Sequence, residues 1–512
     1  MFTRAGAPSA CIVILTLLFL PSDKAHAKDW FLTIGGGYSP AGNQVSLEKN
    51  VIFFKRLLSE QYPKGAPHEI YFADGNSPFP DLQYDPKRDT VPEANRLMAR
   101  FLGSEDYLGY EYRDNELKPV NGIASPENIE AWFRKTTGQL KAKDRVIIYV
   151  TAHGGKSRDR RQPFNTTLHL WDNRSINVSK LSEHIESLPP QVAVVMVMVQ
   201  CYSGGFSHLI FKEGKHDKGL SDRTITGFFA TVQDRVAAGC TPDISEENYQ
   251  EYSSSFWSAI RGKTRLDKSV DSADYDHDAR ISFEEAHIFT ILHSTTIDIP
   301  IRTSGAFLRE FSKQRSKEAP DLLTADESFS DLLELARPAE KIALTDLSKK
   351  LTLSGEDRGK KARATAEVLE KERKDIERTI RDKKRDLSRL RGKIRGHLKK
   401  KWPDLYADFS PTAIRLLTTD KTVFVNAVKS HPDYHPYEKL DQEINQLDEK
   451  EFQVEKQWVQ YQRFLRVLEN VALAANLPKV ADEKVVTRFA ELLKAECETL
   501  GNLFAVKGAT GP

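Results

Sequence analysis

The sequence predicts an α/β fold, a three-layer sandwich with a mostly parallel sheet, followed by an all-α coiled-coil hairpin. From Trp30 to about residue 310, strand-like apolar runs alternate with amphipathic helical segments, an order that places helices on both faces of a parallel sheet. After about residue 335, charged residues dominate and apolar residues recur at alternating spacings of four and three, which is typical of a coiled coil. We therefore assign residues 28–335 to the α/β domain and 336–512 to the helical domain.

Continuous apolar runs identify the strongest strands. Residues 145–150 and 192–199 contain such runs, as expected for strands covered by helices on both faces. The other elements expected in the sandwich are strands at 30–34, 68–72 and 224–231 and a helix at 45–58. In a mostly parallel sheet, functional side chains gather beyond the carboxyl ends of the strands, so the residues after each run are candidates for chemistry.

Two apolar seams of similar length predict the coiled coil. They run from Ala362 to Ile394 and from Leu440 to Ala472, with a proline-containing connector between them, and Pro478 is expected to close the second helix. This pattern indicates an antiparallel hairpin, which could bind a second copy of the chain or a partner protein. The Lys/Arg excess at 381–401 could bind an acidic surface, but such a run more often forms the solvated face of a long helix.

Composition and the N-terminus bound the class of protein. The chain has 512 residues, a net charge of +2, 39% hydrophobic and 29% charged residues, which favours packed domains and gives no basic field for nucleic acid. Arg4, the apolar run 11–20 and the small residues Ala25 and Ala27 form the pattern of a signal peptide. The run is too short to span a membrane. We expect cleavage near Ala27 and export to the periplasm or the medium, with an uncleaved anchor as the alternative.

The four cysteines do not form a disulfide framework. Cys11 would leave with the signal peptide, and Cys201, Cys240 and Cys497 would remain in the mature chain. An odd number in an exported protein indicates a free thiol or an intermolecular bridge. Cys240 and Cys497 could pair with each other or remain two buried thiols, and both alternatives are open.

The most informative residues are His153 and Cys201. Each follows a predicted buried strand, within Tyr149-Val-Thr-Ala-His153-Gly154-Gly155 and Gln200-Cys201-Tyr-Ser-Gly-Gly205. Neighbouring strands would place an imidazole and a thiol on the two sides of one cleft, where the imidazole raises the reactive thiolate fraction. The adjacent glycines would let substrate backbone approach and leave the Gly154 and Cys201 amides free to bind a developing oxyanion.

These two blocks resemble the legumain–caspase clan of cysteine peptidases, and legumain most closely. Legumain has Tyr-Phe-Thr-Asp-His-Gly and Glu-Ala-Cys-Glu-Ser-Gly at the corresponding places, and the segment 225–240 resembles the strand and loop that follow. The resemblance covers about residues 29–310. It implies a caspase-like fold with His153 as general acid/base, Cys201 as nucleophile, and the Gly154 and Cys201 amides as oxyanion hole, with no cofactor required for catalysis.

The sequence departs from the clan around the substrate pocket. Gln200 directly precedes the nucleophile, where legumain has Glu-Ala, and the clan's pocket arginine after the first strand has no counterpart in 35–44. Tyr252-Ser253 resembles the substrate-binding strand of legumain, with Glu251 before it. Gln200, Glu251, Tyr252 and Ser253 are thus candidate substrate contacts, although Glu251 also fits an exposed loop. Asparagine or aspartate specificity does not carry over.

A second motif resembles a calcium-binding EF-hand loop. The residues in ligand positions are Asp274, Asp276, Asp278, Arg280 through its carbonyl, Ser282 and Glu285. Ala279 replaces the usual glycine at the sixth position, where the left-handed conformation costs an alanine about 1 kcal/mol. We expect one structural Ca²⁺ here, with a bare acidic turn as the alternative.

Three functions are compatible with these residues. The first is an exported cysteine endopeptidase, a hydrolase that acts on protein or peptide substrates through a Cys201–His153 dyad. The second is a catalytically inactive caspase-like binding or scaffold protein that works through its coiled coil. The third is a transpeptidase that uses the same dyad with an amine in place of water.

Overall fold

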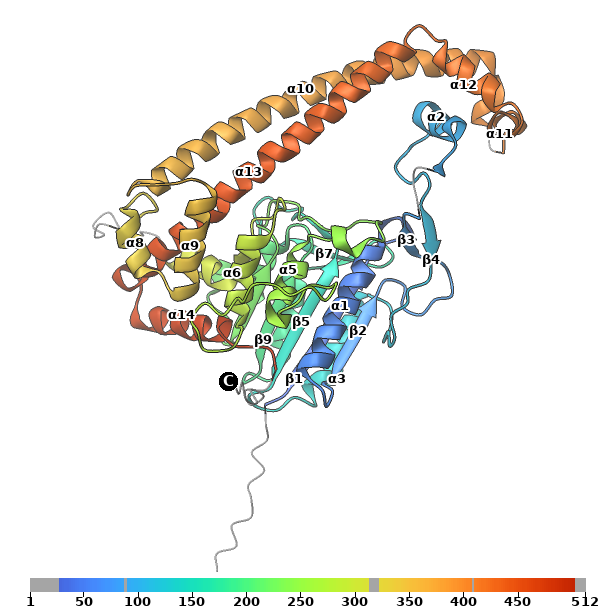
Figure 1. Ribbon diagram of the computed structural model, residues 1–512. Coiled ribbons are helices and arrows are strands. Elements are labelled where there is room, and N and C mark those ends of the chain that lie inside the picture. The colour runs from blue at the N-terminus through green and yellow to red at the C-terminus, as the bar shows by residue number, and fades with distance from the viewer. Residues whose placement is uncertain (1–26, 87–89, 313–321, 408, 502–512) are drawn as a thin grey trace, which may run out of the picture.

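A computed structural model of the chain describes residues 27–86, 90–312, 322–407 and 409–501 (Figure 1). The predicted signal sequence before Ala27 lies outside the described residues. Within these ranges, no helix combines the length and the apolar character that a membrane crossing requires.

The centre of the first domain is a six-stranded, mostly parallel sheet, as the sequence predicts. Its strand order is β11-β10-β9-β5-β1-β2, and only β11 is antiparallel to its neighbour. The strands are β1 (Asp29–Gly36), β2 (His68–Phe72), β5 (Arg145–Ala152), β9 (Ala193–Met198), β10 (Ile225–Phe229) and β11 (Ile301–Arg302). Two small sheets flank it, formed by β3 (Leu82–Tyr84) with β4 (Glu111–Arg113), and by β6 (Gly154–Gly155), β7 (Thr167–Leu170) and β8 (Arg174–Asn177).

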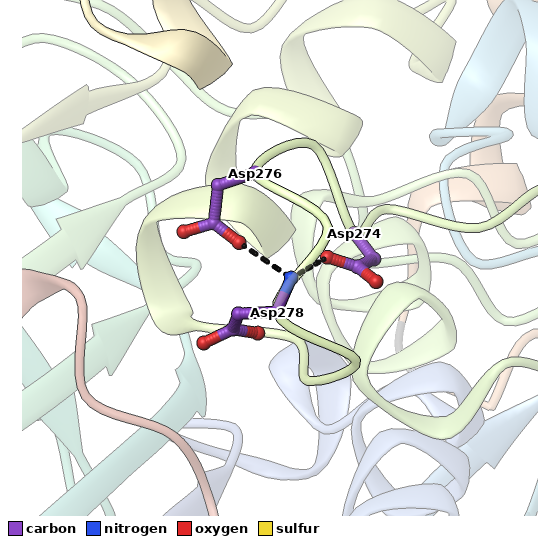
Figure 2. A group of neighbouring side chains, drawn as sticks. All are labelled: Asp274, Asp276 and Asp278. Atoms are coloured by element: carbon purple, nitrogen blue, oxygen red, sulfur yellow. Dashed lines mark hydrogen bonds between the residues drawn. The ribbon is translucent and has the colours of Figure 1, made fainter.

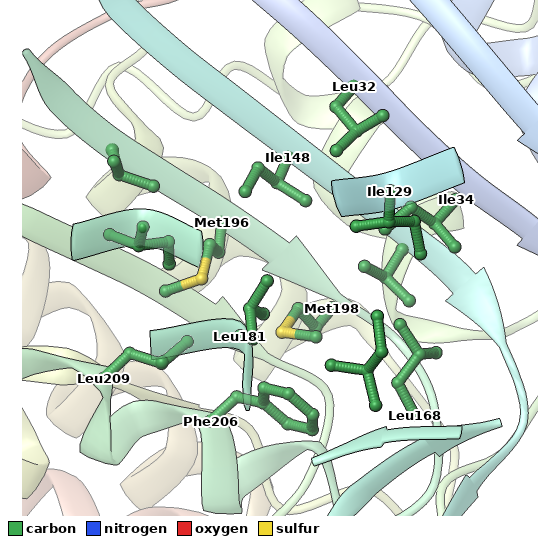
Figure 3. Packing of buried hydrophobic residues seen from close by; sticks show 14 of the residues in the cluster. Leu32, Ile34, Ile129, Ile148, Leu168, Leu181, Met196, Met198, Phe206 and Leu209 are labelled. Atoms are coloured by element: carbon green, nitrogen blue, oxygen red, sulfur yellow. The ribbon is translucent and has the colours of Figure 1, made fainter. Parts of the chain in front are cut away.

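Helices cover both faces of the sheet and complete the three layers. The helices α3 (Pro126–Thr137) and α4 (Val178–Glu186) cover one face, where Ile148 and Met196 pack against Ile129 and Leu181 (Figure 3). The other face carries α1 (Val45–Gln61), α5 (Tyr252–Arg261) and α6 (Phe283–His293). Successive strand side chains point to opposite faces, so the continuous apolar runs supply both cores. Helix α7 (Thr303–Phe311) follows β11.

The C-terminal half is helical. It contains α8 (Phe329–Leu335), α9 (Pro338–Lys350), α10 (Arg358–Lys401), α11 (Pro411–Thr418), α12 (Lys421–Lys429), α13 (Tyr434–Val480) and α14 (Glu483–Glu496). The two long helices α10 and α13 pair within the chain, and their seam buries Ile376, Ile380, Ile444 and Val454. We call α10 to α13 the helical arm. Helix α13 continues through Pro478, so the expected end of the helix was two residues early; a proline this close to the end removes only one terminal hydrogen bond.

The helical arm is anchored at both of its ends, and it arches over the sheet in Figure 1. At its base, Phe464 and Leu468 of α13 pack in one cluster with Ile288 of α6 and Leu344 of α9. At its tip, the cluster around Phe424 of α12 also takes in α2 (Glu93–Leu102), a helix inserted between β3 and β4. Contacts therefore cross the boundary predicted at residue 335, and the tip rests on a helix that the sequence did not predict.

Candidate active site

The structure brings His153 and Cys201 to the same edge of the sheet. Strands β5 and β9 are parallel neighbours with Val150 opposite Met198, so the residues that follow them emerge side by side. Gly154 packs directly on the second block, since a Cβ at this position would lie 2.1 Å from the carbonyl oxygen of Cys201 and 2.7 Å from Cγ of Gln200. The two residues whose amides are expected to form an oxyanion hole are therefore adjacent.

Two oxygen atoms of the loop after β1 orient the His153 ring. Its Nε2 lies 2.8 Å from the carbonyl oxygen of Gly42 and 2.9 Å from Oε1 of Gln44. Both atoms are acceptors, so Nε2 carries the proton and Nδ1 is the nitrogen left to accept one. Burial lowers the pKa of His153, although the hydrogen bond to Gly42 opposes the shift. The imidazole is thus a neutral base at neutral pH.

The Cys201 thiol lies against the loop that follows β10. Its Sγ accepts a hydrogen bond from the Ala237 amide at 3.3 Å and donates to the Ala237 carbonyl at 3.8 Å. Burial raises the pKa of Cys201, the Ala237 peptide lowers it, and the nearby Asp298 carboxylate raises it. In this conformation the pKa of the thiol is raised, because burial outweighs the groups that favour the charged sulfur. The gain in thiolate expected from His153 stays a prediction.

The residue after Cys201 is strained. Tyr202 has a φ of 59°, in the left-handed region, and its amide donates to the carbonyl oxygen of Arg235 at 2.8 Å. A left-handed conformation is uncommon for a bulky side chain and persists where the surroundings fix it. The Arg235 carbonyl and the Ala237 amide thus hold the Cys201-Tyr202 turn from one loop.

Tyr252 and Ser253 do not lie on a strand, so that expectation is wrong. They begin helix α5, and both side chains are buried. The Tyr252 hydroxyl pairs with Nδ1 of His287 at 2.7 Å, and Ser253 accepts from the Tyr149 hydroxyl at 2.9 Å. Apolar residues at Tyr252, Phe256 and Ala259 explain the helix, because their spacing turns one face toward the sheet.

Glu251 and Gln200 are also buried. Glu251 is 3% exposed and pairs with Arg265 at 2.7 Å, so it is not an exposed loop glutamate, and its charge is already matched. Gln200 is 1% exposed, and within the described part of the chain neither polar atom of its side-chain amide has a hydrogen-bond partner. In this conformation neither side chain is open to a substrate.

The acidic loop gathers three of its expected carboxylates. Ligand oxygens of Asp274, Asp276 and Asp278 all lie within 4.8 Å of one another, and Figure 2 shows the first two accepting from the Asp278 amide, at 3.0 and 3.2 Å. Ala279 is left-handed with a φ of 66°, as the motif requires. The loop therefore gathers these three carboxylates and has the left-handed sixth residue that the motif predicts.

The end of the loop is arranged differently from its start. Glu285 accepts from the amides of Tyr275 and Ser282 at 2.8 Å, and Ser282 caps helix α6 through the Glu285 amide. The Arg280 amide donates to Asp278 at 2.8 Å. The Glu285 carboxylate thus serves as a helix cap here, because a serine and a glutamate three residues apart form a capping box.

Cys240 and Cys497 are free thiols in this structure, and both residues are exposed, so the expectation of two buried thiols is wrong. Cys497 donates to Oε2 of Glu284 at 3.1 Å. The structure therefore has Cys240 and Cys497 unpaired.

The partners of the dyad were missed by sequence reasoning. Gly42 and Gln44 lie about 110 residues before His153, and Ala237 lies 36 residues after Cys201. A glycine, a glutamine and an alanine in loops carry no chemical signal of their own, so only the strand order could have pointed to them.

Comparisons with known proteins leave the family open. No family model matches the chain, and a comparison with curated proteins finds no match. Among the solved structures that match is protein GSU0716 from Geobacter sulfurreducens, with 9% sequence identity. The alignment covers 54% of this chain and 92% of that chain with a TM-score of 0.31, a similarity too low to bear on function.

Proposed function

We propose that the chain is an exported cysteine endopeptidase with a caspase-like fold of the legumain–caspase type. One observation carries the proposal: a histidine and a cysteine follow neighbouring parallel strands, and the glycine after the histidine packs on the carbonyl of the cysteine. The position of Gly154 requires glycine, since any side chain would collide with the Cys201 peptide. The arrangement is one in which a nucleophile and a base meet at a single carbonyl.

The reaction starts from a neutral Cys201 thiol and a neutral His153 imidazole. Cys201 Sγ attacks the peptide carbonyl while its proton passes to His153 Nδ1, because the Nε2 proton is already directed at Gly42 and Gln44. The Gly154 and Cys201 amides donate to the oxyanion. The imidazolium then protonates the leaving amine, and a water molecule, deprotonated by His153, hydrolyses the acyl-enzyme and restores the thiol.

The test is cleavage of a peptide library by the purified protein and by Cys201→Ala. Loss of the nucleophile should lower kcat/KM by about 10³-fold or more, and the library should reveal the preferred residue before the scissile bond. Cys240→Ala and Cys497→Ala are matched controls that should retain activity. Equal turnover in Cys201→Ala would reject the proposal, and transfer of the acyl group to an added amine would identify a transpeptidase.

One observation favours the binding protein as the second candidate. The Cys201 thiol is hydrogen-bonded to the Ala237 peptide and its pKa is raised, which suits a nucleophile at rest or a site without turnover. In a binding protein, no peptide of the library would be cleaved, and Cys201 would alkylate as slowly as a buried thiol.

We also propose that the loop of Asp274, Asp276 and Asp278 binds one structural Ca²⁺. The support is the set of carboxylate oxygens within 4.8 Å and the left-handed Ala279. At a hundredfold excess over its dissociation constant, Ca²⁺ should stabilise the protein by about 2.7 kcal/mol, measured as a rise in Tm. Asp276→Asn should abolish the rise, whereas Asp271→Asn, outside the loop, should keep it. No calorimetric heat and no Tm change with Ca²⁺ would leave a bare acidic turn.

A further inference from the structure

The helical arm contacts the loop that holds the nucleophile. We call residues 232–240, which follow β10, the thiol loop. Glu455 of α13 lies 2.5 Å from Nη2 of Arg235 in this loop, and the Arg235 guanidinium lies 4.9 Å from the ring centroid of Trp458. Val459, one residue further, packs with Val232 at the start of the loop. Both charged side chains are mostly buried, so their attraction is weakly screened.

A second contact from α13 reaches the same loop. The buried Arg463 donates to the carbonyl oxygen of Asp298 at 2.9 Å. The Asp298 carboxylate in turn accepts from the Ala238 amide at 2.7 Å. The thiol loop is thus held from α13 at Arg235 and at Ala238, on both sides of the Ala237 peptide that contacts Cys201.

We propose that Arg235 is a positioning residue for Cys201. The ion pair with Glu455 of the helical arm holds Arg235 in place, and Arg235 in turn fixes the positions of the Cys201-Tyr202 turn and the Ala237 peptide. Its backbone carbonyl accepts from Tyr202, while its side chain is held by α13. Arg235 therefore connects a backbone hydrogen bond beside the nucleophile to an ion pair on the arm. The effect on catalysis rests on the proposed peptidase function, but the effect on the thiol does not.

Charge reversal across this pair tests the proposal. Arg235→Glu and Glu455→Arg should each lower kcat/KM by about tenfold, a coupling usual for residues in direct contact, and Arg235→Glu/Glu455→Arg should restore most of it. Iodoacetamide should meanwhile alkylate Cys201 several times faster in the single variants, with its pH midpoint lower, because a loosened loop rehydrates a thiol whose pKa burial raises. Lys383→Glu is the matched control, since Lys383 pairs with Glu443 inside the arm at 2.6 Å.

The two proposals fail in different ways. Suppose that the wild type cleaves peptide and that both single variants match it in turnover and in Cys201 alkylation. This result would overturn the role of Arg235 but would leave the proposed peptidase function intact. Absence of turnover in the wild type would reject the peptidase, while faster alkylation in the single variants, reversed in the double variant, would still support the role of Arg235. Glu455→Gln keeps the shape of the side chain and is therefore a variant that should fold. Cys201 should also be alkylated faster in this variant. An unchanged alkylation rate of Cys201 would count against the role of Arg235.

Discussion

Gly154→Ala is expected to remove almost all activity of the proposed peptidase. The added Cβ would lie 2.1 Å from the carbonyl oxygen of Cys201, far inside van der Waals contact, and the colliding atom belongs to the backbone. Either the His153-Gly154 turn or the Cys201 peptide must move by about 1 Å, and a displacement of that size can cost about 10²-fold in rate. We expect at least this loss in kcat, measured with the best peptide of the library.

Gly392→Ala is the matched control for this substitution. Gly392 lies within helix α10, and a Cβ there would meet no atom of the residues that the structure describes within 4 Å. The control should keep full activity and unfold at a higher denaturant concentration, since alanine favours a helix by about 1 kcal/mol over glycine. Full activity of Gly154→Ala would mean that catalysis does not depend on the close packing of Gly154 on the Cys201 peptide.

Arg463→Met is expected to cause the largest loss of stability. The guanidinium of this buried arginine donates to four carbonyl oxygens, those of Ile291, Ser294, Thr296 and Asp298, at 2.6 to 3.3 Å. These carbonyls belong to the last turn of α6 and the segment after it. Methionine would remove the Arg463 donors and leave the Ser294 carbonyl only the 3.5 Å hydrogen bond from Gln460. We expect the free energy of unfolding to fall by about 3–5 kcal/mol, measured by urea denaturation.

Arg389→Met provides the comparison for Arg463. Arg389 lies on α10, is 72% exposed in its side chain and pairs with Asp386 at 2.8 Å. An exposed pair of this kind contributes at most about 1 kcal/mol, so its loss should change the unfolding midpoint little. Similar midpoints for the two variants would show that the carbonyls near Arg463 find other donors or water.

Short-range patterns predicted the sheet and the arm well. Residues 145–150 became the core of β5 because a buried strand needs only a continuous apolar run, and Ile380 and Ile444 meet because the seam repeats along each helix. His153 and Cys201 lie at the same edge of the sheet for the same reason, since each follows such a run. The alternation of elements was enough to place both at one edge.

Long-range pairing could not be read from the sequence. Tyr252 was expected on a strand from a two-residue resemblance, but its helical spacing with Phe256 decides the structure. Glu251 became buried because Arg265, which is 14 residues away, neutralises it. The contact of Arg235 with Glu455 spans 220 residues, and nothing in either local sequence signals the other partner.

Because helix α2 receives the tip of the helical arm, the number of residues in the arm is a constrained quantity. Phe101 of α2 meets Tyr437 with ring centroids 4.9 Å apart, while Glu455, 18 positions further along α13, contacts the thiol loop. This distance along the helix is about 27 Å at 1.5 Å per residue. Deleting one heptad from both long helices would keep the seam in register yet draw the tip back by about 10 Å. An insertion or deletion in the helical arm therefore requires a compensating change in the segment that carries α2. Among homologous chains, the length of the arm and the length of that segment should vary together.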